Sequence, residues 1–141
     1  MTDNPWQVVN VGLVPYPEAW RLQHRLLAAR IEGLVPDTLV LLEHPHVYTF
    51  GRRAVPEHLL LTPAQLAERG VETVWVDRGG DITYHGPGQR VAYAMLDLSR
   101  RRQDVRAFVG ALEDWLIDAL ADVGVRGTRR AERVEIGRAH V

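Results

Sequence analysis

The residues best suited to bind a ligand lie in one segment, Arg78 to Gln89 (RGGDITYHGPGQ). Four glycines and a proline surround Arg, Asp, Thr, Tyr and His side chains. Glycine lets the backbone come close to a ligand while polar neighbours point at it. A glycine pair after a strand can also hold an anion or a carbonyl oxygen through exposed backbone N–H groups. The same spacing fits a pair of tight hairpin turns with incidental polar residues, so the segment alone leaves both alternatives open.

A second polar segment, Leu41 to Arg52 (LLEHPHVYTFGR), ends in another Gly-Arg pair. His44 and His46 could ligate a metal, but they flank a proline in a turn, with no cysteine and no HExxH pattern nearby. We therefore expect histidines that hydrogen-bond in a loop, and neither a metal nor a cofactor. His85 is the better candidate to face a ligand, because its neighbours are polar and glycines hold it on a turn.

The residue types that are missing restrict the chemistry. The 141 residues include no cysteine, which excludes disulfides, thiolate metal sites and a cysteine nucleophile within them. All 17 basic residues are arginine, which excludes Schiff-base chemistry and a lysine-tuned nucleophile. The hydroxyls of Thr83 and Ser99 have no recognisable His-carboxylate arrangement around them.

The overall charge excludes some classes of partner. A formal net charge of -1 and a pI of about 6.6 argue against the basic surface that nucleic acids and anionic membranes require. No apolar segment reaches the length of a membrane span, and the N-terminus has no basic stretch followed by an apolar run. We therefore expect a cytoplasmic protein that contacts neither nucleic acid nor membrane.

Strands and helices alternate along the chain and must position the two polar segments. The patterns predict an α/β (α+β) domain with a mixed β-sheet flanked by helices. The longest helix is amphipathic, with Asp104 as its N-cap and Gly124 at its end. The predicted strands span residues 6–14, 38–42, 74–76 and 91–98, and the predicted helices span 17–33, 62–70 and 104–124.

The two polar segments, in this order, resemble the N-terminal signatures of the bacterial octanoyltransferases, the lipoyl(octanoyl) transferases of the lipoate-protein ligase B family. The following AYAMLDLSRR and ALEDWLIDALADVGV also fit this family's pattern. The resemblance runs from about residue 6 to residue 132 and covers nearly the whole chain.

The resemblance implies the fold of lipoate and biotin protein ligase catalytic domains and a two-step acyl transfer. A cysteine of the enzyme takes the octanoyl group from octanoyl-acyl carrier protein, and a lysine of a lipoyl domain then receives it as an amide. The implied acceptors are the lipoyl domains of 2-oxoacid dehydrogenases and the glycine cleavage H protein. The implied lining of the acyl-substrate pocket consists of Arg78, Gly79, Gly80, Asp81, Ile82, Thr83, Tyr84 and His85.

The C-terminal part departs from the family pattern. The family continues with a segment that carries a lysine and later a Cys-Gly pair with the nucleophile, and neither is present in this sequence. We therefore expect no catalytic residue in these 141 residues and no turnover by them alone. We also expect residues 1–134 to be the N-terminal part of a single catalytic domain and residues 135–141 (EIGRAHV) to be a non-native tail.

Two other functions remain open. One is an ATP-dependent lipoate or biotin protein ligase of the same fold, although ligases of the lipoate type resemble a Ser-Gly-Gly-Gly pattern where this chain has Arg-Gly-Gly. The other is a non-catalytic module that binds an acyl or anionic ligand through the glycine-rich segment. A change in thermal stability on addition of ATP is expected only for the ligase.

Overall fold

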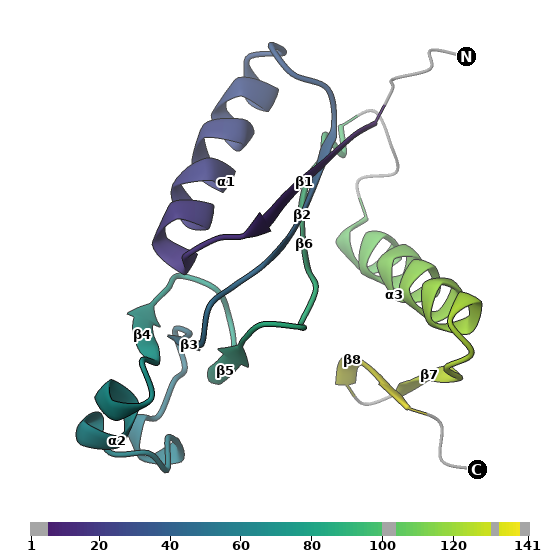
Figure 1. Ribbon diagram of the computed structural model, residues 1–141. Coiled ribbons are helices and arrows are strands. Elements are labelled where there is room, and N and C mark those ends of the chain that lie inside the picture. Colours follow the sequence, from purple (N-terminus) through teal and green to yellow (C-terminus); the bar gives the residue numbers. More distant parts are fainter. Residues whose placement is uncertain (1–5, 100–103, 131–132, 139–141) are drawn as a thin grey trace. The chain divides into compact units, whose positions relative to one another are not determined.

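The computed structural model describes residues 6–99, 104–130 and 133–138. The chain divides into two compact units, residues 1–97 and 98–141. The first unit contains β1 (Gln7–Leu13), α1 (Tyr16–Ile31), β2 (Thr38–Glu43), β3 (Val47–Phe50), the 3₁₀ helix η1 (Pro56–His58), α2 (Pro63–Glu68), β4 (Glu72–Trp75), β5 (Ile82–His85) and β6 (Val91–Met95) (Figure 1). The second contains α3 (Val105–Asp122), β7 (Gly127–Arg130) and β8 (Arg133–Arg138).

The first sheet has the strand order β1-β2-β6, with β1 parallel and β6 antiparallel to the central strand β2. Along β2 every second residue is buried, which places Val40 and Leu42 on one face. α1 covers that face (Figure 1), and its Ala19 packs against these two side chains and Met95. The prediction of a buried central strand at residues 38–42 is therefore confirmed.

The second sheet has the strand order β4-β3-β5, with β4 parallel and β5 antiparallel to β3. The sequence analysis predicted no strand at β3 or β5, which have only four residues each. So short a strand gives too few alternations to stand out from a turn. The predicted mixed pairing is present, but the strands of the first unit form two mixed sheets instead of one.

Helix-capping residues explain where the predicted helices begin. Thr62 and Gln65 form a reciprocal capping box at α2, in which each side chain accepts a hydrogen bond from the other residue's backbone N–H. Asp104 accepts hydrogen bonds from the N–H groups of Arg106 and Ala107, both at 3.0 Å, at the start of α3. All three predicted helices are confirmed.

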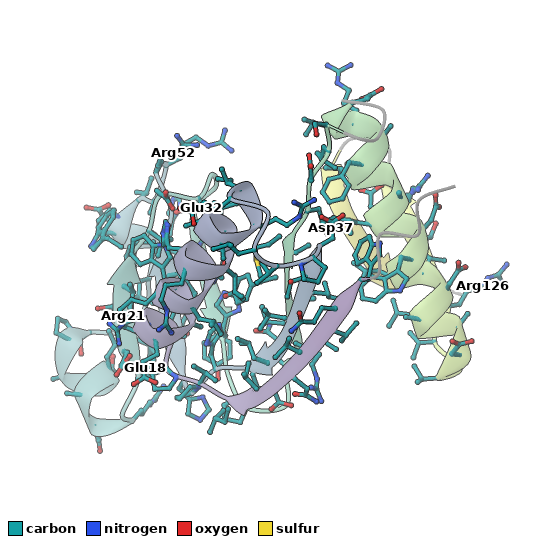
Figure 2. All side chains as sticks on the ribbon, turned by 90° about the horizontal axis from the view of Figure 1, so that it is seen from above. Glu18, Arg21, Glu32, Asp37, Arg52 and Arg126 are labelled. Carbon is teal, nitrogen blue, oxygen red and sulfur yellow. The ribbon has the colours of Figure 1, made fainter. Side chains whose placement is uncertain are left out.

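A charged network fixes the start of β2. Asp37, labelled in Figure 2, is 2% exposed. Its Oδ1 accepts a hydrogen bond from Arg30 Nε at 2.6 Å and another from the backbone N–H of Asp97 at 3.0 Å. Arg30 Nη2 also lies 3.3 Å from Asp97 Oδ2. The end of α1, the start of β2 and the segment after β6 are thereby joined.

The second unit is a helix with a two-stranded antiparallel hairpin, β7–β8. Arg129 joins the two by ion pairs to Glu113 (3.1 Å) and Asp114 (2.6 Å) on α3. No side chain of α3 is buried. No helix in the described part of the chain is long and apolar enough to cross a membrane.

Candidate functional site

The Arg-Gly-Gly part of the glycine-rich segment is a loop that docks on the chain leaving β3. Three consecutive backbone N–H groups donate to its carbonyl oxygens: Gly51 to Asp81 at 3.1 Å, Arg52 to Arg78 at 3.0 Å and Arg53 to Gly80 at 3.1 Å. The side chain of Arg52 itself projects away from the fold (Figure 2) and is exposed. The backbone of residues 51–53, and not the Arg52 side chain, therefore fixes the shape of the loop.

Two glycines make this docking sterically possible. A Cβ on Gly51 would lie 2.5 Å from the carbonyl oxygen of Gly80 and 3.0 Å from that of Gly79. Gly80 has a φ of +87°, in the left-handed region that favours glycine. Gly79, by contrast, has open space where a Cβ would lie. A ligand could approach the backbone at Gly79 without displacing protein atoms.

Arg78 fastens the loop to β3 and adds a positive charge. Its Nη2 donates to the carbonyl oxygen of Thr49 at 2.7 Å and to Oγ1 of the same residue at 2.8 Å. Its Nη1 donates to the carbonyl oxygen of Gly79 at 2.9 Å. Among the described residues no carboxylate forms an ion pair with this half-buried guanidinium. Its charge therefore remains available to an anionic group beside the loop.

Asp81 also serves the scaffold. Its Oδ1 accepts a hydrogen bond from the backbone N–H of Val55 at 3.0 Å, and its Oδ2 lies 2.5 Å from His58 Nδ1. The hydrogen bond from His58, followed by that from Val55, lowers the pKa of the Asp81 carboxyl below its ordinary value. Both carboxylate oxygens thus hold the η1 segment in place.

Strand alternation divides the last four residues of the predicted pocket between two faces of β5. Successive side chains of a strand point to opposite faces. Thr83 and His85 therefore share one face, whereas Ile82 and Tyr84 share the other. Tyr84 lies against His46, and the Tyr84 hydroxyl is 2.6 Å from Nδ1 of His46. Of the eight predicted residues, only Thr83 and His85 bring their side chains together on the face that carries Arg78.

His85 is held on three sides. Its Nδ1 lies 2.9 Å from Oε1 of Gln89. Its ring is stacked on Tyr16, with centroids 6.2 Å apart, and meets the ring of His44 edge-on at 5.6 Å. The ring is half-buried. Among the described residues its Nε2 has no hydrogen-bond partner.

His44 is fully buried behind His85. Its Nδ1 lies 2.7 Å from the carbonyl oxygen of Val14, so Nδ1 must donate, and its Nε2 lies 2.9 Å from the hydroxyl of Tyr93. Burial lowers the pKa of His44 and raises the pKa of the Tyr93 hydroxyl. The imidazole is therefore neutral, with Nε2 accepting from Tyr93.

The prediction that His44 and His46 hydrogen-bond in a loop is confirmed. In the described part of the chain no group of three or more His, Cys, Asp or Glu residues could hold a metal ion. An apolar hollow of about 470 Å³ lies on the other face of β3. It is lined by Phe50, Pro56, Glu57, Leu59, Leu61, Pro63, Leu66 and Thr73.

The sequence analysis missed several residues that shape this site. Thr49 is the acceptor for Arg78, and Tyr16 and Tyr93 supply the aromatic surroundings of the two histidines. Tyr16 and Tyr93 lie outside both motifs, so no local pattern indicated them. Gln89 lies four residues after His85 across a Gly-Pro-Gly turn, and this spacing could have indicated the contact.

Comparison with known proteins shows which chains this one is similar to. Octanoyltransferases of Chloroflexus aggregans and Cereibacter sphaeroides are each 48% identical to the chain, over 86% and 96% of its length and 55% and 59% of theirs. The chain thus spans little more than half the length of these curated relatives. A solved structure from Thermoplasma acidophilum, described as a bi-partite lipoate protein ligase and its E2 lipoyl domain, has the same fold, with a TM-score of 0.64 at 15% identity over 89% of this chain and 48% of that one.

A family model also matches most of the chain. Residues 15–138 match the family described as lipoyl protein ligase A/B catalytic domain, and they include both polar segments, both three-stranded sheets except for β1, and all of α3. The chain therefore belongs to the lipoyl protein ligase A/B catalytic domain family.

Proposed function

We propose that this chain is the acyl-binding part of an octanoyltransferase, which moves an octanoyl group from octanoyl-acyl carrier protein to a lysine of a lipoyl domain. The relatives that share 48% identity with it bear the name octanoyltransferase. The lipoyl domains of 2-oxoacid dehydrogenases and the glycine cleavage H protein are the proposed acceptors. The cysteine and lysine of the family pattern would come from a segment outside these 141 residues.

One observation carries the proposal: the glycine loop offers hydrogen-bond donors beside an uncompensated positive charge. Among the described residues the backbone N–H groups of Gly79 and Gly80 donate to no acceptor. Within the described ranges, Arg78 donates only to neutral oxygen atoms, those of Thr49 and Gly79. Acyl transfer passes through a tetrahedral intermediate with a negative oxygen, and fixed donors and charges of this kind stabilise it.

The residues of the loop then divide their tasks. In this proposal the N–H groups of Gly79 and Gly80 bind the thioester oxygen, and the charge of Arg78 favours its negative form. Thr83 and His85 line the pocket with their side chains. Ile82 and Tyr84, on the other face of β5, contribute backbone only, and Asp81 keeps the loop in shape through Val55 and His58.

Substitution at Gly79 tests the binding site without disturbing the fold. A valine there meets no protein atom within 4 Å and requires no positive φ. We expect Gly79→Val to keep the stability of the parent protein and to lose affinity for an octanoyl thioester, because the side chain fills the space that the ligand needs. Unchanged affinity would contradict the assignment of the pocket. Gly80→Val is a poorer test, since its φ of +87° strains any side chain.

The reaction is tested with the full-length protein, octanoyl-acyl carrier protein and a lipoyl domain. Intact mass should show an octanoyl adduct on the enzyme, followed by an amide on the lipoyl domain. Formation of product only when ATP and free octanoate are supplied would instead indicate a ligase. The domain boundary at residue 134, the tail at 135–141 and the cytoplasmic location remain predictions.

A further inference from the structure

We propose that His85 accepts the proton that the acceptor amine must lose when it attacks the acyl thioester, and that Gln89 is the residue that positions His85 for this step. The inference rests on the proposed function, and it assigns a role to a glutamine outside the predicted pocket. It is drawn from the hydrogen bond between the two side chains and from the free nitrogen of the ring.

Gln89 selects one tautomer of His85. The amide oxygen Oε1 can only accept a hydrogen bond, so Nδ1 of His85 carries the hydrogen in the 2.9 Å contact. In the neutral ring, Nε2 then keeps its lone pair. Among the described residues Nε2 has no partner. A base whose other nitrogen is fixed by an acceptor is the arrangement that general-base catalysis requires.

The loop that carries Gln89 is itself anchored. The backbone N–H of Gln89 donates to the carbonyl oxygen of Gly86 at 3.1 Å, which closes a tight turn. The N–H of Gly88 donates to Oε2 of Glu43 at 2.8 Å, which ties the same turn to the end of β2. The turn therefore holds the Gln89 amide group in place. The orientation of the His85 ring is set before a ligand binds.

Among the described residues, the two rings packed against His85 leave its Nε2 without a hydrogen bond. Tyr16 from α1 stacks on the His85 ring, and the neutral His44 after β2 meets it edge-on. Behind them, Tyr93 bonds to His44, while Arg78 and Asp77 act electrostatically on Tyr16. In the described structure no carboxylate forms an ion pair with His85. Nε2 of His85 is therefore open to a hydrogen bond from a bound amine.

The step balances without any further reactant. The nitrogen of the acceptor lysine forms a C–N bond to the thioester carbon, and one N–H proton passes to Nε2 of His85. The C–S bond then breaks, the thiolate leaves, and the imidazolium returns the proton to the sulfur. The overall change is thioester plus amine to amide plus thiol. Imidazole suits this exchange because its ordinary pKa is close to neutral.

The two half-reactions are measured separately in single turnovers of the full-length protein at saturating donor. We expect His85→Gln to slow amide formation about 10²-fold or more, the usual effect of removing a general base, and to slow formation of the acyl-enzyme far less, because in that step the ring only lines the pocket. His24→Gln is the matched control, because it removes a histidine from the exposed side of α1. It should change neither acyl-enzyme formation nor amide formation. ¹⁵N NMR of the ring should show the Nδ1–H tautomer of His85 in the parent protein and a mixture in Gln89→Leu.

The variant Gln89→Glu tests whether Gln89 acts on His85 through its hydrogen bond or only by packing against it. In Gln89→Glu a carboxylate faces Nδ1 and stabilises the imidazolium, so the acid limb of the pH–rate profile for amide formation should move to higher pH. Equal slowing of both half-reactions by His85→Gln, or an Nε2–H tautomer in the parent protein, would overturn the proposal. Absence of both half-reactions in the parent protein would instead refute the proposed function itself, and the proton-acceptor role with it.

Discussion

Replacing Gly51 by alanine should loosen the glycine loop from β3. The new Cβ would lie 2.5 Å from the carbonyl oxygen of Gly80, about 1 Å closer than an ordinary contact, and that oxygen belongs to the backbone. The loop must move away, which weakens the hydrogen bonds from Gly51 to Asp81 and from Arg53 to Gly80. At about 1 kcal/mol for each bond, we expect the free energy of unfolding to fall by about 2 kcal/mol.

Urea unfolding of the two proteins side by side provides the assay, and affinity for an octanoyl thioester is measured on the same samples. Gly79→Ala is the matched control for stability, since its Cβ meets nothing within 4 Å. We expect the control to unfold at the urea concentration of the parent protein. If Gly51→Ala unfolds with the control and binds the thioester normally, the loop does not depend on this close approach, and the reasoning fails.

Other substitutions test the remaining contacts. Tyr93→Phe removes the donor to the buried Nε2 of His44 and should lower the free energy of unfolding by about 1–3 kcal/mol in a urea titration. Burial lowers the pKa of His44 in the folded protein, so as the pH falls the unfolded chain takes up this proton at a higher pH than the folded one. The free energy of unfolding should therefore decrease as the pH drops below about 6.5. Urea titrations at several pH values would measure this decrease. A pH-independent stability from pH 7 to 5 would contradict the neutral assignment. Arg78→Lys should weaken thioester binding as well as stability, since an ammonium cannot reach all the oxygens that the guanidinium fork contacts, and calorimetry would measure the loss. Asp37→Ala leaves Arg30, among the described residues, with the ion pair to Asp97 alone, and thermal unfolding should occur at a lower temperature than in the parent protein.

Much of the fold could be predicted because long periodic elements and caps are local signals. Asp104 and Gly124 bound a helix whose pattern repeats over five turns, and the apolar run of β2 is flanked by turn residues. β3 and β5 are different, since a four-residue strand is defined by its partner and not by its own sequence. The pairing of Thr49 with Thr83 could not be inferred from either segment alone.

In the site, too, local patterns could be predicted from the sequence and tertiary contacts could not. The two motifs predicted two segments that the structure brings together, because glycine-rich and histidine-rich patterns are visible in the sequence. They could not separate residues that face a ligand from residues that hold the loop. Arg78 and Asp81 look equally polar in sequence, and only the contacts to Thr49 and to His58 show that both side chains support the scaffold. Tyr16 reaches His85 through tertiary packing alone.

The alternation of side chains along β5 has a practical consequence for altering this protein. Thr83 and His85 lie on one face, and Ile82 and Tyr84 on the other, so the strand separates two sets of substitutions that share no direct contact. Under the proposed function, changes on the first face should alter which acyl group binds, and changes on the second should alter only thermal stability. Substitutions on opposite faces should couple less strongly than substitutions on the same face, where side chains share partners. A library that varies both faces at once could therefore be searched one face at a time.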